Sequence, residues 1–363
     1  MRIVWNSFHG RFSDNPRALW EQLAGRPDLE HVWLADPAHR SAFPADVHTV
    51  DITTPEAVAV LESADLLVAN THTELEWEKS ARTTYVQTWH GTPLKRIHRD
   101  VLWAPEGRLD RLDHDVAKWD LLLSPNPVST PRLRRAFRYD GEVLESGYPR
   151  NDLLSSPAAR DVGRRVRSEL GIAEDTTVVL YAPTWRDNEV FGDEARPVPL
   201  MLDVELFART LGDDHALLVR AHNMVTGRSA VAATPGVHDV SFFPDVRDLY
   251  CAADVLLTDY SSTMFDFAVT GRPIVHYAYD LEDFQSSIRG FYFDLLPEAP
   301  GPVVRSSEEV VEVLGDLAAT TTAYADRYAA FRQQYACLED GHAGRRVLER
   351  LQLDARRPVA SGS

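Results

Sequence analysis

Residues 254–271 read Asp254-Val-Leu-Leu-Thr-Asp-Tyr-Ser-Ser-Thr-Met-Phe-Asp-Phe-Ala-Val-Thr-Gly271. The run from Val255 to Leu257 is apolar and has the length of a short buried parallel strand. Ser261 is placed to cap a helix over residues 262–270, whose apolar side chains would face a core. Gly271 suits the end of that helix, because glycine readily adopts the left-handed backbone conformation found there.

This succession of strand, polar turn and helix predicts a phosphate-binding cradle. Unpaired N–H groups and the positive end of the helix dipole favour an anion at such a turn. Thr258 ends the strand, and the hydroxyls of Ser261 and Ser262 add donors. We interpret the turn as the donor-phosphate site of a transferase. The alternative is an ordinary capped helix of an α/β protein, since serine is common at helix starts.

Length and composition are those of a globular protein with two domains. The chain has 363 residues, and 44% of them are hydrophobic. The net charge of −17 argues against nucleic acid as a partner, because no basic excess exists to displace counterions. Cys251 and Cys337 lie far apart and outside any metal-binding spacing, which indicates a reducing compartment.

The sequence favours a cytoplasmic protein. No stretch approaches the roughly twenty consecutive apolar residues of a transmembrane helix. The start, Met-Arg-Ile-Val-Trp, has the pattern of a strand rather than of a signal peptide. We expect a soluble protein whose membrane contact is peripheral, at the inner face of the cell membrane. The arginine-rich segments 132–138 and 164–167 are expected to be solvated helix faces, with anionic lipid or polymer as the alternative partner.

Short strands alternate with helices along both halves of the chain. A stretch of turn-forming residues at 147–152 separates the halves. Such alternation predicts parallel sheets covered by helices on both faces. We expect two Rossmann-type doubly wound domains, residues 1–150 and 151–355, with terminal helices in the second and a flexible tail at 356–363. We place the site in the cleft between them, because such sheets bind ligands beyond the carboxyl ends of their strands.

A candidate for proton transfer follows the strand expected at 84–88. His90 stands there, followed by Gly91, which lets another group approach closely, and by Thr92. A lone histidine at a strand end is more often structural, and that alternative stays open on this stretch alone.

Other expected strand ends, and the start of the last helix, carry side chains that suit a phosphate. These are Thr184, Arg186, Arg220, His222, Asp340 and His342. Surface ion pairs are the alternative for the arginines. Because most of these stretches follow predicted strands, we favour a site built from convergent polar groups.

Several common cofactor and nucleophile motifs are missing from the sequence. It contains no Gly-x-Gly-x-x-Gly, no Gly-x-x-x-x-Gly-Lys-Ser/Thr and no Gly-x-Ser-x-Gly. A nicotinamide or flavin site, a P-loop nucleotidase and a nucleophile-elbow hydrolase are therefore not expected. No metal-ligand spacing is present either, so we expect no required cofactor and leave dependence on a divalent cation open.

Seven separated motifs together resemble a known family. They are Gln87-Thr-Trp-His-Gly-Thr-Pro-Leu-Lys95, Gly147-Tyr-Pro-Arg-Asn-Asp152, Tyr181-Ala-Pro-Thr-Trp-Arg186, Arg220-Ala-His222, Thr258-Asp-Tyr-Ser-Ser262, Arg289-Gly-Phe-Tyr-Phe-Asp294 and Asp340-Gly-His-Ala343. Over roughly residues 80–350 the chain resembles the CDP-glycerol glycerophosphotransferases, which include the teichoic-acid primases and polymerases.

The resemblance implies a GT-B architecture and a phosphotransferase. Such an enzyme moves glycerol phosphate, or another polyol phosphate, from a CDP-activated donor to a hydroxyl of a growing teichoic-acid or capsule-type polymer and releases CMP. The acceptor would be lipid-linked or polymeric.

The candidate residues then take roles in that reaction. We expect His90 to act as general base and His222 to bind or protonate the leaving phosphate. Ser261 and Ser262 would hold the pyrophosphate, with the other phosphate-site candidates around them. Arg150 is expected on the acceptor side of the cleft, with Gly91 and Thr92.

Three other functions share parts of this pattern. A GT-B glycosyltransferase would use a nucleotide sugar and release a nucleoside diphosphate. A nucleotide-sugar hydrolase or epimerase would turn over without an acceptor. A non-catalytic polymer-binding module would release no CMP. The sequence also leaves open whether the donor carries glycerol or ribitol, and whether the enzyme is a primase or a polymerase.

Overall fold

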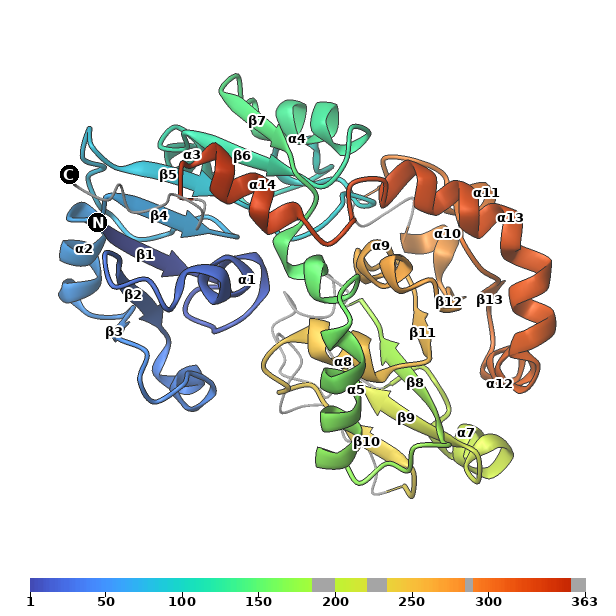
Figure 1. The fold of residues 1–363 in the computed structure, drawn as a ribbon. Coiled ribbons are helices and arrows are strands. Elements are labelled where there is room, and N and C mark those ends of the chain that lie inside the picture. Colours follow the sequence, from blue (N-terminus) through green and yellow to red (C-terminus); the bar gives the residue numbers. More distant parts are fainter. Residues whose placement is uncertain (185–199, 221–233, 285–289, 354–363) are drawn as a thin grey trace, which may run out of the picture. The chain divides into compact units, whose positions relative to one another are not determined.

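The computed structural model describes residues 1–184, 200–220, 234–284 and 290–353 (Figure 1). Contacts divide the chain into two units. The first unit contains Met1–His90, Gly107–Leu153 and residues 338–353. The second contains Gly91–Glu106 and, within the described ranges, residues 154–337.

A parallel sheet of seven strands forms the first unit, in the order β3-β2-β1-β4-β5-β6-β7. Its strands are β1 (Arg2–Asn6), β2 (Glu30–Ala35), β3 (Thr49–Asp51), β4 (Leu66–Ala69), β5 (Thr84–Gln87), β6 (Leu121–Ser124) and β7 (Glu142–Glu145). Its helices are α1 (Asp14–Leu23), α2 (Pro55–Glu62), α3 (Arg108–Val116), α4 (Ser129–Phe137) and α14 (Ala343–Arg350), with 3-10 turns η1 (Pro37–Ala42) and η3 (Pro149–Leu153).

In the described part of the second unit, six parallel strands run in the order β10-β9-β8-β11-β12-β13. They are β8 (Thr177–Ala182), β9 (His215–Val219), β10 (Val237–Asp239), β11 (Val255–Thr258), β12 (Ile274–Tyr277) and β13 (Val303–Val304). The helices are α5 (Ala158–Glu169), α7 (Val204–Leu211), α8 (Val246–Ala252), α9 (Thr263–Phe267), α10 (Leu281–Asp283), α11 (Leu295–Glu298), α12 (Ser307–Gly315) and α13 (Leu317–Tyr335), with 3-10 turns η2 (His98–Asp100) and η4 (Ala268–Thr270).

These two sheets confirm the predicted α/β class. In each, the first strand lies inside the sheet, the next two strands extend to one side of it, and the later strands extend to the other. The order reverses between β1 and β4 in the first sheet, and between β8 and β11 in the second. Ligands of doubly wound sheets bind at such switch points, beyond the carboxyl ends of the strands. The two reversals therefore indicate where to look for a site in each unit.

Contacts divide the chain differently from the borders expected at 150 and 355. Helix α14 belongs to the first unit, because Val347 and Leu348 are buried in its core beside Trp5. The segment 91–106 belongs to the second unit, where Lys95 forms an antiparallel bridge with Phe291. The expected flexible tail at 356–363 lies outside the described residues. None of the described helices has the length and apolarity needed to cross a bilayer.

Candidate functional site

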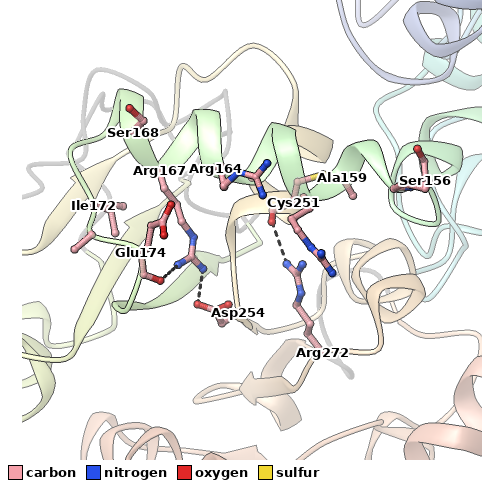
Figure 2. Close-up of a pocket in the computed structure, with 14 residues that line it drawn as sticks. Ser156, Ala159, Arg164, Arg167, Ser168, Ile172, Glu174, Cys251, Asp254 and Arg272 are labelled. Carbon is pink, nitrogen blue, oxygen red and sulfur yellow. Dashed lines mark hydrogen bonds and ion pairs between the residues drawn. The ribbon is translucent and has the colours of Figure 1, made fainter.

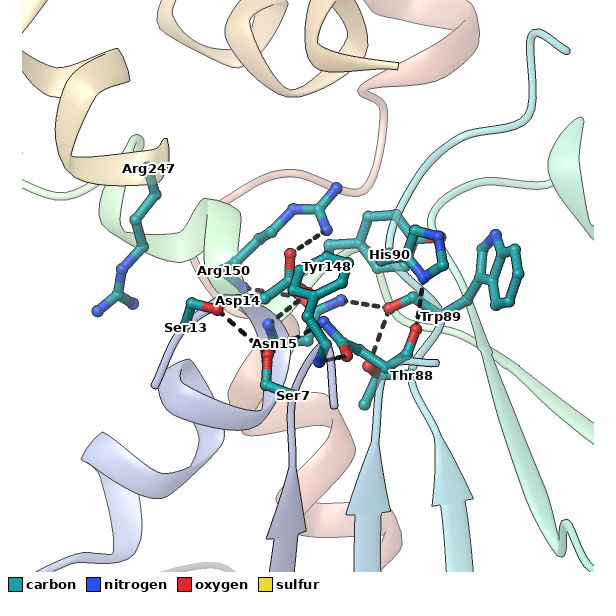
Figure 3. Close-up of polar contacts among 12 residues, drawn as sticks. Ser7, Ser13, Asp14, Asn15, Thr88, Trp89, His90, Tyr148, Arg150 and Arg247 are labelled. Atoms are coloured by element: carbon teal, nitrogen blue, oxygen red, sulfur yellow. Dashed lines mark hydrogen bonds and ion pairs between the residues drawn. The ribbon is translucent and has the colours of Figure 1, made fainter. Parts of the chain in front are cut away.

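At the switch point of the first sheet, polar side chains follow β1 and β4. Asn70, directly after β4, donates from its amide to Ser7 Oγ at 3.2 Å. The side-chain oxygen of Asn70 accepts from the backbone of Phe8 at 2.9 Å. Asn15 donates to the carbonyl of Trp89 at 3.1 Å, and so ties α1 to the end of β5 (Figure 3). Ser7, Asn15 and Asn70 were not among the residues predicted from the sequence. The position of Ser7 and Asn70 directly after apolar strands is a signal that could have identified these two.

His90 is held in one orientation by this network. Its Nδ1 lies 2.5 Å from the carbonyl oxygen of Asn70. A carbonyl only accepts, so Nδ1 carries the proton and Nε2 keeps its lone pair. No described residue forms a hydrogen bond with Nε2. Burial lowers the pKa of His90, and the bond to Asn70 opposes that shift. A neutral imidazole with a free basic nitrogen suits proton abstraction.

Backbone strain surrounds this histidine. Trp89, Phe8 and His9 have φ angles of 54°, 43° and 57°, in the left-handed region that non-glycine residues rarely occupy. Each such residue costs on the order of 1–3 kcal/mol, and strain of this kind gathers at functional sites. Ring centroids of Trp89 and Phe8 lie 4.1 Å and 5.3 Å from that of His90. The strained residues therefore form the immediate surroundings of the imidazole.

Arg150 lies in the same network, but its charge is already paired. The guanidinium bonds the carboxylate of Asp14 at 2.7 Å, and the two side chains are only 3% and 6% exposed (Figure 3). The backbone N–H of Arg150 donates to Asn15 Oδ1 at 3.1 Å. The arginine therefore anchors the start of α1 to η3, and its expected place at the acceptor stays a prediction.

The switch point of the second sheet is built by Thr258 and Asp259. Thr258 is fully buried, and its hydroxyl donates to the carbonyl of Ala182 at 2.7 Å, which joins β11 to β8. Asp259 Oδ1 accepts from the backbone N–H of Thr184 at 2.9 Å and of Tyr260 at 2.6 Å. Through these contacts Asp259 fixes the backbone of the turn.

Ser261 and Ser262 complete this turn and offer unused donors. Ser261 Oγ accepts from the backbone of Thr263 at 3.3 Å. No described residue accepts from the backbone N–H groups of Ser261 and Ser262 or from the hydroxyl of Ser262. Helix α9 has only five residues before η4, and Gly271 follows η4 with the expected left-handed φ of 74°. Because α9 is so short, individual N–H and O–H donors matter more here than a helix dipole.

Gly91 lies against this turn, within the second unit. A Cβ atom at position 91 would lie 2.7 Å from Ser262 Oγ. Thr92, the next residue, is buried. Glycine at this position therefore permits close packing against the turn formed by Ser261 and Ser262, which we call the serine turn.

Asp340 and His342 belong to the first unit, at the start of α14. The backbone N–H groups of Ala343 and Gly344 both donate to the carboxylate of Asp152, at 2.8 Å each. Asp152 thus occupies the helix N-terminus where we expected a phosphate. Asp340 accepts two hydrogen bonds from Arg346 at 2.9 Å each, and its expected place at the donor phosphate, like that of His342, stays a prediction.

Three basic candidates remain from the second half. Arg220 donates to the carbonyls of Val240 and Phe243, at 3.2 and 2.9 Å. Arg186 and His222 lie outside the described residues. Within the described ranges, no group of His, Cys, Asp and Glu is arranged to hold a metal ion.

A large surface pocket, of about 940 Å³, lies between α5, α8 and the start of β11 (Figure 2). Arg167 donates there to the carbonyl of Ala252 and pairs with Asp254, and Arg272 donates to the carbonyl of Cys251. These arginines satisfy the carbonyls at the carboxyl end of α8. Asp254 precedes β11, so the pocket is at the amino end of that strand, opposite the serine turn.

Comparisons with known proteins agree with one another. Residues 1–353 match the model of the family described as CDP-Glycerol:Poly(glycerophosphate) glycerophosphotransferase. The chain is 37% identical over 359 residues to the teichoic acid glycerol-phosphate transferase of Staphylococcus aureus, covering 96% of this chain and 92% of that protein. It is 33% identical to the teichoic acid poly(glycerol phosphate) polymerase of Bacillus subtilis, covering 95% of this chain and 48% of the other.

The solved structure of the wall teichoic acid polymerase TagF superposes on this chain with a TM-score of 0.88 at 31% identity. The match covers 97% of this chain and 88% of the other. It confirms the predicted GT-B-like fold.

Proposed function

We propose, from the premise that the chain belongs to the family of CDP-glycerol:poly(glycerophosphate) glycerophosphotransferases, that it transfers glycerol phosphate from CDP-glycerol to a hydroxyl of a growing teichoic-acid-type polymer. The observation that carries the proposal is the state of His90. Its Nδ1 is held by the Asn70 carbonyl and its Nε2 has no described partner, at the switch point of the first sheet.

His90 acts as the general base in this reaction. Nε2 takes the proton of the acceptor hydroxyl as its oxygen attacks the distal phosphorus of the donor. The bond from that phosphorus to the bridging oxygen breaks, and CMP leaves with the electron pair. Phosphoryl transfer depends mainly on positioning and charge stabilisation, and a positioned base contributes about 10²–10⁴-fold in rate.

The serine turn of the second unit holds the donor pyrophosphate. The unused N–H groups of Ser261 and Ser262 and the hydroxyl of Ser262 support this role. Arg220 and, from sequence position, Arg186 supply positive charge, and His222 binds or protonates the leaving phosphate. The first unit then serves the acceptor and the second the donor.

The acceptor is a lipid-linked or polymeric polyol phosphate, and the protein meets it at the inner face of the cell membrane. Trp103 and Leu102 support peripheral contact, because 71% and 56% of their surfaces are exposed. Tryptophan favours the membrane interface, where its ring is partly buried and its N–H stays hydrated. Co-sedimentation with anionic vesicles should fall when both residues become serine, and undiminished binding would contradict this contact.

A substrate panel tests the proposed function. The protein is incubated with CDP-glycerol or with CDP-ribitol, each with a lipid-linked glycerol phosphate primer, and CMP release and product mass are followed. We expect CMP with CDP-glycerol and a product heavier by glycerol phosphate units. Release of a nucleoside diphosphate from a nucleotide sugar, turnover without an acceptor, or binding without CMP release would each favour one of the other functions.

A further inference from the structure

The loop after β1, residues 7–11, carries two basic side chains, His9 and Arg11, to which the proposed reaction assigns no role. Hydrogen bonds fix the backbone of this loop. The N–H groups of Gly10 and Arg11 donate to the carbonyl of Ser7, at 3.0 and 2.7 Å, and Asp36 donates to the carbonyl of Gly10 at 2.9 Å. A Cβ atom on Gly10 would lie 2.2 Å from the nitrogen of Asp36. The loop therefore packs tightly against Asp36, the residue that follows β2.

This loop stands beside the proposed base. Asn70 accepts from the backbone N–H of Phe8 through its side chain and from His90 through its carbonyl. The ring of Phe8 lies 5.3 Å from the ring of His90, and both Phe8 and His9 keep left-handed φ angles. Because β1 and β5 both flank β4, the loop places His9 and Arg11 at the same edge of the sheet as the imidazole.

Arg11 is a half-buried cation, and no described residue accepts a hydrogen bond from its guanidinium. Burial lowers its pKa, with Asp36 opposing the shift. His9 is exposed in the same loop, two residues before Arg11. A partly desolvated guanidinium without a hydrogen-bonded partner is costly, and a bound anion removes that cost.

We propose that Arg11, assisted by His9, binds the terminal phosphate group of the acceptor polymer. This inference rests on the proposed function, which needs an acceptor hydroxyl at His90. In a glycerol phosphate chain the free hydroxyl and the nearest phosphate belong to one glycerol unit. An acceptor hydroxyl at the base therefore brings a phosphate close to it, and a guanidinium binds phosphate by two parallel hydrogen bonds. The loop thus selects acceptors that end in a polyol phosphate.

Steady-state kinetics of Arg11→Gln test the proposal. A charged hydrogen bond to phosphate is worth roughly ten- to a hundredfold in affinity, so we expect Arg11→Gln to raise the acceptor KM by that factor. The donor KM and the kcat at saturating acceptor should change less than about twofold, because the loop does not bind the donor. Arg82→Gln is the control, an exposed arginine just before β5, at the amino edge of the same sheet.

A binding measurement without the donor gives a second readout. By calorimetry the wild type should bind glycerol phosphate more tightly than glycerol, and Arg11→Gln should abolish the difference. An unchanged acceptor KM together with unchanged glycerol phosphate binding overturns this inference, even where CMP release continues. Absence of CMP release by the wild type overturns the proposed function instead. If the glutamine variant does not fold, Arg11→Lys should show a smaller rise in acceptor KM, and no rise counts against the proposal.

Discussion

Replacing Gly91 by alanine should disturb donor binding through Ser262. A Cβ atom at position 91 would lie 2.7 Å from Ser262 Oγ and 3.0 Å from Ser262 Cβ. Carbon atoms pack favourably at about 3.5–4.0 Å, so Ser262 must retreat by roughly 0.5 Å or more. Gly91 is not among the residues with positive φ, so alanine itself fits the backbone. The substitution therefore displaces the side chain of Ser262, and with it the hydroxyl, rather than straining the backbone at position 91.

If that hydroxyl holds a charged phosphate oxygen, its loss is worth about 1.5–3 kcal/mol, or roughly ten- to a hundredfold in affinity. Overpacking should cost about 1–3 kcal/mol of stability at most, so the protein stays folded. The assay is calorimetric binding of CDP-glycerol, with thermal unfolding as the check on folding. Ser262→Ala is the matched variant and should lose affinity by a similar factor.

The double variant Gly91→Ala/Ser262→Ala decides whether the two positions act together. Because both changes remove the same contact, the double variant should lose little more than Ser262→Ala alone. Wild-type affinity in folded Gly91→Ala, or losses that add in the double variant, would refute this reasoning.

Three further predictions concern His90, Asp115 and Asp152 of the first unit. Because burial lowers the pKa of His90, the acid limb of the rate–pH profile should have its midpoint below pH 6.5, and a midpoint well above that value would contradict a buried base. Asp115 is buried on α3, where it accepts hydrogen bonds from the hydroxyl of Tyr85 and the indole N–H of Trp119. Burial raises the pKa of Asp115 to about 7, so its contribution to the free energy of unfolding is greatest below about pH 4 and is lost as the pH rises to about 7. Denaturant titrations of Asp115→Asn should show a flatter dependence of stability on pH, and an unchanged slope would be contrary evidence. Asp152→Ala removes two hydrogen bonds from the start of α14 and should lower the free energy of unfolding by about 1–2 kcal/mol, with increased hydrogen exchange in α14; unchanged stability would count against this contact.

The strands were the most predictable part of the fold. The sequence patterns predict strands at Arg2–Asn6, Glu142–Glu145, Thr177–Ala182 and Val255–Thr258, and β1, β7, β8 and β11 have these bounds. Short runs between turn formers leave little freedom for a buried parallel strand. The serine turn was predictable for the same reason. Its position depends on local signals, namely an apolar strand, paired hydroxyls and a glycine after the helix.

Long-range pairing was not predictable from local patterns. Val347 and Leu348 show which face of α14 is apolar, but not that this face packs on the first sheet. Arg150 and Asp14 are 136 residues apart, so the arginine looked available for a ligand until its partner was known. The left-handed backbone of Phe8 and Trp89 left no trace in the sequence, since neither is a glycine.

The central claim is that the imidazole of His90 removes the acceptor proton. The most direct measurement is the rate of CMP release from CDP-glycerol and a lipid-linked glycerol phosphate primer, by the wild type, His90→Ala and the control His48→Ala, an exposed histidine of the same unit. We predict that His90→Ala binds CDP-glycerol normally but turns over at least about a hundredfold more slowly, while the control keeps its rate. A folded His90→Ala that releases CMP at the wild-type rate would contradict the account.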